Sequence, residues 1–364
     1  MRHGWRRLLG CLAVLVLVQV SATPGTCAEP PPILHRPTLD RPTLHRIVAI
    51  GDLHGDFDAW RAIARAAGLV DKQGRWVGGE TVLVQTGDVV DRGPDSRKLI
   101  QDLMRLQHEA ARRHGRIIAL VGNHEAMNIT GDLRYVSAAD YAAYADGQSR
   151  VRREQAYARN ITAIEAQYRQ GDPALGSATI RQAWLTATPL GYLEHLAAWR
   201  PDGAIGRWVI GNPAVIVLDG VLFVHGGISP AYARVLPADI NALVATALAA
   251  RTTAPDAIIN DEQGPLWYRG LALPADGEAS GAGPDPTVTA QLDALLPAAG
   301  AGRIVIAHTP RLAGIAVLQG GRLIRIDTGI SAVYGGKLSY LEILDGALTT
   351  HEVERPSSAD RGKR

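Results

Sequence analysis

The feature that most constrains this chain is a set of short β-branched runs, each followed by a polar cluster rich in glycine, aspartate or histidine. The runs have four to six residues and no hydrophobic alternation, which predicts strands buried on both faces. Because ligands of α/β sheets bind beyond the carboxyl ends of strands, we expect the clusters to meet at one sheet edge. The runs are 46–50, 81–85, 116–121, 221–224 and 303–306.

The segments between the first runs have helical spacing. Residues 58–67 and 96–114 are amphipathic, and Leu99, Leu103 and Leu106 share one side of the second segment. Strands that alternate with helices predict an α/β fold. Three later turn dipeptides predict hairpins, and hence an antiparallel part: Asp219-Gly220, Gly320-Gly321 and Asp345-Gly346.

Three regions depart from this alternation. The stretch 129–205 carries few strand signals and predicts a helical insertion, in which 180–199 is the clearest helix. The stretch 270–287, rich in Gly, Pro, Ala and Asp, predicts a long surface loop. The polar stretch 354–364 predicts a disordered tail, so we expect the folded domain to span 46–353.

The first 28 residues have the pattern of a secretory signal peptide. Three arginines precede the apolar run 8–20, and small residues follow as far as Ala28, where we expect cleavage. The run has 13 residues, fewer than the roughly 20 that a membrane span needs. A proline-rich linker over 29–45 would follow. We therefore expect a periplasmic or secreted protein with no stable membrane span. An uncleaved anchor is the alternative, and Sec and twin-Arg export both stay open.

Composition excludes two further classes of function. Removal of 1–28 removes both cysteines, Cys11 and Cys27, so the mature chain has no cysteine nucleophile. The chain carries 38 Lys and Arg against 36 Asp and Glu, a formal charge of +2. That balance gives no basic footprint for nucleic acid.

The polar clusters share one kind of chemistry. Carboxylate, amide and imidazole donors suit Mn, Fe, Zn or Ni better than an all-oxygen calcium site. Asp52 and His54 are two residues apart, so on extended backbone they would point the same way. The candidate metal ligands are Asp52, His54, Asp88, Asn123, His225 and His308.

The motifs together carry a family resemblance. They read GDLHG at 51–55, GDVVDRG at 87–93, GNHE at 122–125, HGG at 225–227 and AHT at 307–309. In this order they resemble the calcineurin-like metallophosphoesterases, and more narrowly the phosphoprotein phosphatase family. AHTP at 307–310 and WYRG at 267–270 are similar to its bacterial, Shewanella-like branch. The resemblance implies an α/β/β/α sandwich of two mixed sheets flanked by helices.

The resemblance also implies a centre of two metal ions, divalent or of mixed valence. Manganese is expected first, with iron, zinc and nickel as alternatives. Asp52 and His54 would ligate the first ion, and Asp88 would bridge both. The second ion would be completed by Asn123, His225 and His308.

Four further residues receive catalytic roles from the resemblance. His124 would be the general acid that protonates the leaving oxygen, and Asp91 would hold its ring. Arg92 would bind phosphate, and Arg269 is the best match for a second phosphate-binding arginine. Weaker matches for that second role are Arg251 and Arg303.

These roles imply an exported phosphatase that hydrolyses phosphate monoesters by direct attack of a metal-bridging hydroxide. Its substrate would be a phosphorylated protein or a small phosphoester. Residues 327–336 depart from the Ser-Ala-Pro-Asn-Tyr loop of the eukaryotic Ser/Thr enzymes, which favours tyrosine or broad specificity over Ser/Thr. The alternative is a dinucleoside polyphosphate or phosphodiester hydrolase of the same fold. A more remote alternative is a non-catalytic binding module that retains the metal.

Several residues have a simpler interpretation. Gly-Asp pairs commonly mark turns, and single histidines on helices are usually core or solvated residues, as we expect for His195. For Glu125 we favour a salt bridge that supports the site over metal ligation. Trp267 and Tyr268 could stack on an aryl substrate or simply pack in the core.

Overall fold

The protein is described from a computed structural model, which covers residues 46–272 and 285–356. The predicted signal peptide and linker, most of the predicted loop and residues 357–364 lie outside these ranges. Within the predicted tail, Arg355 donates hydrogen bonds to Oδ2 of Asp56 and to the carbonyl of Ile330, at 3.2 and 2.6 Å. Over the two described ranges, no helix is long and apolar enough to cross a membrane.

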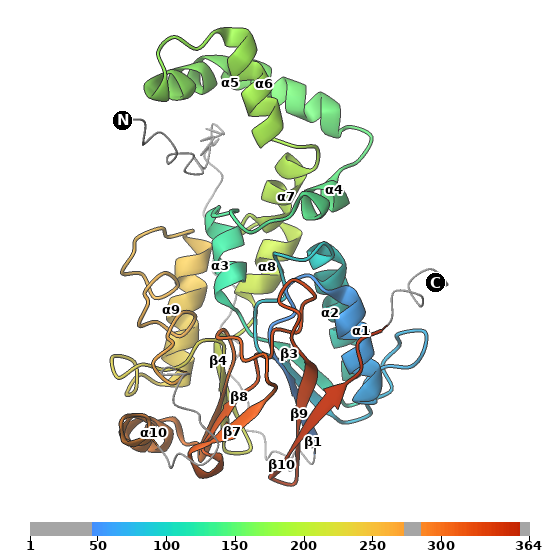
Figure 1. Ribbon diagram of the computed structural model, residues 1–364, viewed down its shortest axis with the longest axis vertical. Coiled ribbons are helices and arrows are strands. Elements are labelled where there is room, and N and C mark those ends of the chain that lie inside the picture. The colour runs from blue at the N-terminus through green and yellow to red at the C-terminus, as the bar shows by residue number, and fades with distance from the viewer. Residues whose placement is uncertain (1–45, 273–284, 357–364) are drawn as a thin grey trace, which may run out of the picture.

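Two mixed sheets form the body of the molecule (Figure 1). The first has the order β10-β9-β1-β2-β3 and the second the order β4-β5-β6-β8-β7. The strands of the first sheet are β1 (Arg46–Ile50), β2 (Val82–Gln85), β3 (Arg116–Ala119), β9 (Leu338–Leu344) and β10 (Ala347–Val353). Those of the second are β4 (Val215–Leu218), β5 (Val221–Val224), β6 (Arg303–Ile306), β7 (Ala316–Leu318) and β8 (Leu323–Arg325).

The predicted strands are buried on both faces, as their unbroken apolar runs indicate. Ile47 and Ala49 belong to the cluster between the sheets, together with Phe223 of β5. Their neighbours Val48 and Ile50 belong to the larger cluster on the helix side. A strand with both faces covered has no position for a polar residue until it ends, which is why the polar clusters follow the runs.

Helices cover the outer faces of both sheets. α1 (Phe57–Ala66) and α2 (Ser96–Ala111) pack on the first sheet, where Leu99, Leu103 and Leu106 are buried as predicted. α9 (Pro237–Ala249) and α10 (Pro286–Ala299) lie on the side of the second sheet (Figure 1). The predicted α/β/β/α sandwich is confirmed.

The three predicted hairpins are present. Asp219 and Gly220 join the antiparallel strands β4 and β5, and both have positive φ, as a two-residue hairpin turn requires. Asp345 and Gly346 join β9 and β10 in the same way. A short 3₁₀ turn, η2 (Gln319–Gly321), joins β7 and β8.

Helices follow β3 over the stretch predicted as an insertion. After α3 (Asn123–Thr130), these are α4 (Ala138–Tyr144), α5 (Ser149–Gly171), α6 (Ser177–Ala187), α7 (Tyr192–Trp199) and α8 (Ala204–Ile210). Figure 1 shows α5 and α6 projecting away from the sheets. They share a small cluster of their own, built around Tyr157, Ile164, Ile180 and Trp184.

The prediction of one helix over 180–199 was wrong, because the structure breaks it into α6 and α7. Pro189 and Gly191 lie in the break, and Gly191 has a φ of 90°. A Cβ at Gly191 would lie 1.7 Å from the carbonyl oxygen of Tyr141. The break therefore lets α7 approach α4 closely.

Candidate metal centre

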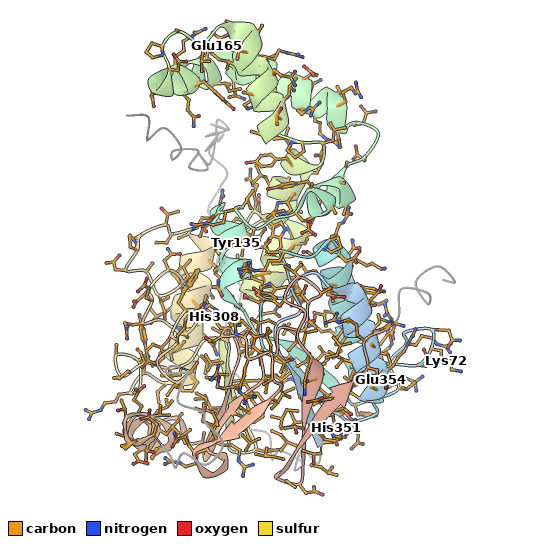
Figure 2. The ribbon with its side chains drawn as sticks, in the orientation of Figure 1. Lys72, Tyr135, Glu165, His308, His351 and Glu354 are labelled. Atoms are coloured by element: carbon orange, nitrogen blue, oxygen red, sulfur yellow. The ribbon has the colours of Figure 1, made fainter. Side chains whose placement is uncertain are left out.

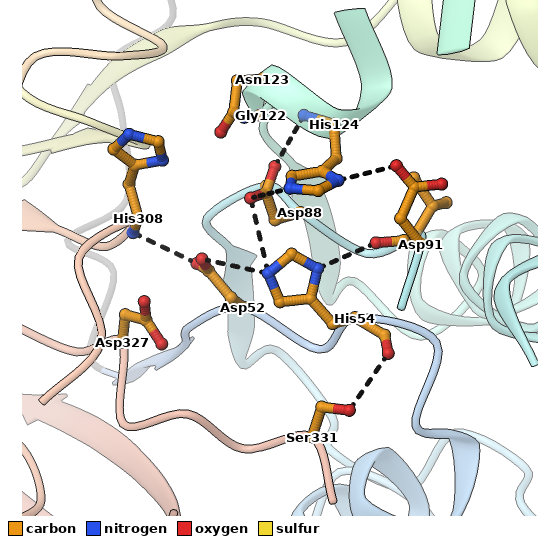
Figure 3. A network of polar contacts seen from close by, with 12 residues as sticks. Asp52, His54, Asp88, Asp91, Gly122, Asn123, His124, His308, Asp327 and Ser331 are labelled. Atoms are coloured by element: carbon orange, nitrogen blue, oxygen red, sulfur yellow. Dashed lines mark hydrogen bonds and ion pairs between the residues drawn. The ribbon is translucent and has the colours of Figure 1, made fainter. Parts of the chain in front are cut away.

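The polar clusters of both sheets meet at one edge, where the strands end. Asp52, Asp88 and Asn123 follow β1, β2 and β3, whereas His225 and His308 follow β5 and β6. Figure 3 shows Asp52, His54, Asp88, Asn123 and His308 around one centre. All of them are buried. The sequence-based expectation that the clusters come together is therefore met, although it leaves the role of each residue open.

Two of the loops touch backbone to backbone. The amide of Gly93 donates to the carbonyl of His54 at 3.0 Å. A Cβ at Gly93 would lie 2.4 Å from that carbonyl oxygen, and one at Gly55 would lie 2.8 Å from the carbonyl carbon of Gly93. Only glycine permits such an approach, so the outer glycines of the two motifs lock the loops together.

The site is built on strained backbone. Non-glycine residues with positive φ include His54 at 40°, Asp88 at 53° and His308 at 65°. Each such residue costs on the order of 1–3 kcal/mol and persists only where its surroundings over-determine it. Asp91 and Arg92 share the conformation, at 69° and 67°. Such strain is concentrated at functional sites.

Asp88 lies at the middle of the cluster. Its Oδ2 is 3.7, 3.9 and 3.4 Å from the Nε2 atoms of His54, His124 and His225. Its Oδ1 accepts a hydrogen bond from the backbone amide of His124 at 3.0 Å. Two donors that share one ion at about 2.0–2.2 Å each lie roughly 3–4 Å apart. The separations around Oδ2 therefore suit a shared cation better than direct hydrogen bonds.

Two histidines present lone pairs to Asp88 because their other ring nitrogens are occupied. Nδ1 of His54 lies 3.0 Å from the carbonyl oxygen of Val90, and Nδ1 of His225 lies 2.8 Å from that of Thr86. A carbonyl only accepts, so each Nδ1 carries the hydrogen and each Nε2 is left as a ligand atom. Such a backbone contact is the usual support of a metal-binding histidine.

The lone pairs at the second half of the site need a cation or a proton among them. Nε2 of His225 faces Oδ1 of Asn123 at 3.0 Å and Oδ2 of Asp88 at 3.4 Å. Nε2 of His308 is buried without a hydrogen-bond partner. Asp88, His225 and His308 can converge on one ion, and His54 and Asp88 lie close enough to hold a second, with His124 beside them. The donor set fits the two metal ions that the resemblance implies.

Charge in the cluster is balanced by neighbouring groups. Burial raises the pKa of Asp52, and the carboxylates of Asp327 and Asp88 raise it further. Burial also raises the pKa of Asp327, to about 6. For Asp88, burial acts in the same direction, but the imidazoles of His225 and His124, when protonated, outweigh it and hold the pKa well below its usual range. A cation would relieve the repulsion among these buried carboxylates.

Glu125 supports the site, but not through the salt bridge that we expected. Its carboxylate accepts backbone N–H groups from Asp88 at 2.9 Å, Val89 at 2.9 Å and Gly122 at 2.8 Å. The side chain thus joins the second and third motifs. A buried carboxylate can satisfy three amides that no strand or helix satisfies here, and it needs no basic partner. Burial raises its pKa to about 7.

His124 and Asp91 form a hydrogen-bonded pair. Nδ1 of His124 lies 2.7 Å from Oδ2 of Asp91, and Oδ1 of Asp91 accepts from Nδ2 of Asn128 at 2.9 Å. Burial opposes a charge on His124, but the carboxylates of Asp88 and Asp91 outweigh it and raise the pKa. The ring is therefore suited to carry and deliver a proton at Nε2.

Arg92 lies between two aromatic rings. Its guanidinium carbon is 4.4 Å from the ring centre of Tyr135 and 5.3 Å from that of Tyr334. Tyr334 also packs on His54, and Tyr135 packs on His124. Cation–π contacts of this kind hold the flat guanidinium in place without consuming its donors.

Arg269 lies on the opposite side, beside the loop of His308. It donates to the carbonyl of His308 at 3.1 Å and to Oγ1 of Thr309 at 2.9 Å. The structure thus brings Arg269 to the rim of the cluster. The less favoured Arg251 instead donates to the carbonyl of Ile129, and Arg303 to that of Gly346.

A pocket of about 320 Å³ adjoins the cluster. Tyr135, which packs on His124, and Trp267, which contacts His308, are part of its lining. Figure 2 shows Tyr135 close to where the helical insertion meets the body of the molecule. The remaining lining residues are Met127, Thr130, Asp132, Arg134, Thr253 and Asn260.

Sequence reasoning missed several members of the site. Asp327 lies beside Asp52, and Asn128 and Tyr135 contact the His124–Asp91 pair. Asp327 follows the strand β8, so the rule that found the other clusters could have found it. Asn128 lies one helical turn beyond His124, a spacing that places both on one side of α3. Nothing in the local sequence marks Tyr135.

Comparison with known proteins gives a consistent result. The model of the calcineurin-like phosphoesterase family matches residues 45–312. An uncharacterized protein of Schizosaccharomyces pombe is 31% identical over 306 residues, which cover 82% of this chain and 76% of that protein. Shewanella-like protein phosphatase 2 of Arabidopsis thaliana is 38% identical over 187 residues, which cover 50% of this chain and 46% of that protein.

A solved structure shares the fold. The cold-active protein-tyrosine phosphatase of a psychrophilic Shewanella species matches with a TM-score of 0.60 and 23% identity. The match covers 85% of this chain and 81% of that one. At this identity the likeness supports the arrangement of sheets and helices alone.

Proposed function

Because this chain belongs to the calcineurin-like phosphoesterases, which are metal-dependent hydrolases, we propose that it hydrolyses phosphate monoesters on phosphorylated proteins. The observation that carries the proposal is the position of Asp88. It lies among three imidazoles, one of which is the hydrogen-bonded partner of Asp91. Asp88, the proposed bridging ligand, therefore lies next to His124, the proposed proton donor.

The proposed ligands of two ions are Asp52, His54, Asp88, Asn123, His225 and His308. When bound, the cations would neutralise charge on the phosphoryl oxygens and make water a competent nucleophile near neutral pH. Mixed oxygen and imidazole donors suit manganese, iron, zinc and nickel, and we propose manganese first because the family resemblance implies it.

The side chains of the protein supply binding and proton transfer. Arg92 would bind two phosphoryl oxygens, because a guanidinium matches them in a bidentate fashion, and Arg269 would bind from the other rim. Water attacks phosphorus, the bond to the leaving oxygen breaks, and that oxygen takes the proton from Nε2 of His124. Asp91 keeps the hydrogen on Nδ1, so Nε2 is the nitrogen that faces the substrate. The products are inorganic phosphate and an alcohol or phenol.

We propose tyrosine or broad specificity ahead of Ser/Thr specificity. The pocket beside His124 carries the aromatic side chains Tyr135 and Trp267, which can pack against an aryl leaving group. Names of relatives such as Shewanella-like protein phosphatase support a phosphoprotein as the substrate.

A substrate panel tests this function. Phosphotyrosine and phosphoserine peptides, bis(p-nitrophenyl) phosphate and a dinucleoside tetraphosphate would be compared at one metal concentration. We expect the phosphotyrosine peptide to give the highest kcat/KM. Faster hydrolysis of the diester or the tetraphosphate would replace the proposal with the alternative of the same fold.

We further propose that the protein is exported to the periplasm or beyond the cell. The support is the basic and apolar pattern of residues 1–28. N-terminal sequencing of the protein recovered from a cell-envelope fraction would give Glu29 as the first residue. A mature protein that keeps Met1 and stays in the cytoplasmic fraction would contradict export.

A further inference from the structure

The turn formed by Asp91, Arg92 and Gly93 carries two proposed functions at once. Asp91 hydrogen bonds to the ring of His124, and Arg92, whose guanidinium lies on the ring of Tyr135, is the proposed phosphate-binding residue. Asp91 and Arg92 adopt positive φ, a region that side chains other than glycine rarely enter. A turn in this conformation needs contacts from outside itself to hold it.

The start of the helical insertion supplies those contacts. The amide of Arg92 donates to the carbonyl of Tyr135 at 2.9 Å. The hydroxyl of Ser137 lies 3.2 Å from the carbonyl oxygen of Gly93. Tyr135 also places its ring on the Arg92 guanidinium, so backbone and side chain hold the same residue.

A second connection passes through Ser96, the first residue of α2. Oγ of Ser96 accepts the amide of Asp91 at 3.0 Å. The amide of Ser96 in turn donates to Oδ1 of Asp140 at 3.0 Å. Ser96 thus contacts the turn through its hydroxyl and Asp140 through its backbone amide.

Asp140 belongs to α4, and its side chain is nearly inaccessible, with 1% of the residue exposed. Ser137 caps α4 by accepting the amide of Asp140, and its hydroxyl lies 3.2 Å from Oδ2 of that carboxylate, which leaves Oδ1 to face α2. Asp95, at the start of α2, makes no capping hydrogen bond with its own side chain. The insertion thus provides a cap that α2 does not provide for itself.

We propose that Asp140 is a positioning residue, which acts through Ser96 to hold the Asp91–Gly93 turn in the conformation that orients His124 and Arg92. The inference rests on the proposed phosphatase function for its kinetic consequence only. Its structural consequence, an ordered turn, can be measured whether or not the protein is a phosphatase. It gives the helical insertion a role in aligning the site.

The test compares Asp140→Ala and Asp140→Asn with the matched control Asp102→Ala. Asp102 belongs to α2 and is nearly buried, and its Oδ2 accepts a hydrogen bond from Nε1 of Trp60 at 2.8 Å, so it joins α2 to α1 rather than to the insertion. Both alanine variants remove a carboxylate that joins α2 to another helix. Only Asp140→Ala removes the support of the turn.

The first readout is hydrogen exchange of peptides that cover 88–96, measured on the metal-free proteins. We expect exchange in Asp140→Ala to be faster by about tenfold or more. Asp102→Ala should exchange at the wild-type rate, and Asp140→Asn should recover most of the protection, because its amide oxygen still accepts the Ser96 amide. Wild-type exchange in Asp140→Ala would overturn the inference. If Asp140→Ala fails to fold, Ser96→Ala takes its place with the same expected result.

The second readout is the dependence of kcat on the leaving group. A misaligned acid affects a poor leaving group most, so Asp140→Ala should lose about tenfold more on phenyl phosphate than on p-nitrophenyl phosphate. Equal losses on the two esters, as expected for Asp102→Ala, would overturn the positioning role. A wild-type protein that hydrolyses neither ester would refute the proposed function, and the exchange experiment would still decide the inference.

Discussion

Oδ2 of Asp91 lies 2.7 Å from Nδ1 of His124, while Oδ1 of the same carboxylate accepts from Asn128. The pair is buried, and the backbone amide of His124 is bound to Asp88. The proposed acid is therefore held from three sides, with only Nε2 left to face a substrate. This geometry determines the first prediction.

Replacement of His124 by Asn should leave metal binding nearly intact and remove proton delivery. We expect kcat on phenyl phosphate to fall by about 10²–10⁴-fold and kcat on p-nitrophenyl phosphate to fall much less, because nitrophenolate leaves without a proton. Steady-state kinetics on both esters, with the metal content of each sample measured, checks the prediction. Equal losses on the two esters would contradict an acid role.

Replacement of Asp88 by Asn should weaken both metal sites. The neutral amide removes the carboxylate whose Oδ2 lies within 3.9 Å of the imidazoles of His54, His124 and His225. We expect fewer than one ion per chain after dialysis at micromolar free metal, against two for the wild type. Metal analysis of the dialysed proteins checks this, and two ions retained in the variant would rule out a bridging role.

Replacement of Glu125 by Ala should destabilise the protein strongly. Three buried amides would lose their acceptor, and each costs about 1–3 kcal/mol when left unpaired. Urea unfolding should show a loss of at least about 3 kcal/mol. The control is Glu165→Ala on α5, whose ion pair with Arg169 lies near the surface and should contribute little to stability. Similar losses of stability in both variants would contradict the role of Glu125 as the acceptor of three buried amides.

His195 should make folding stability depend on pH. Burial against Tyr141, Tyr144 and Trp199 lowers its pKa from 6.5 to about 3. Between these values the unfolded chain binds a proton that the folded chain excludes, so stability rises with pH, by about 1.4 kcal/mol per unit for one group. The contribution of the neutral, buried His195 to the free energy of unfolding is complete above pH 6.5 and is lost as the pH falls toward 3.

The measurement is the difference in unfolding free energy between wild type and His195→Gln at several values between pH 7 and 4. The stability of the wild type should fall more steeply with acid than that of the variant. Parallel curves for wild type and His195→Gln would show that His195 gains its proton in the folded state.

The sheets and the metal cluster could be predicted because each depends on local pattern. A strand covered on both faces shows an unbroken apolar run, and a parallel arrangement brings the residue after each run to one edge. The same logic placed Asp52, Asp88 and His225 together without any knowledge of their distances. Asp219-Gly220 and Asp345-Gly346 specify their hairpins through backbone conformation alone.

The supporting residues could not be predicted because their partners are distant in sequence and pack only in three dimensions. Asp140 contacts Ser96 across 44 positions, and no spacing rule links a residue of an insertion to a helix before it. The sequence suggests a basic side chain as the partner of Glu125. Its partners are instead backbone amides, and no residue type in the sequence marks a backbone amide as a partner. The break before α7 follows from the approach of Gly191 to Tyr141, which is also a tertiary effect.

The central claim is that this cluster holds two metal ions that the hydrolysis requires. The most direct measurement is p-nitrophenyl phosphate hydrolysis by residues 29–364, after chelation and then during titration with Mn²⁺, with bound metal determined in the same samples. We predict loss of activity on chelation, and recovery that tracks the second equivalent of bound ion. Activity that survives chelation, or that stays absent with two ions bound, would contradict the claim.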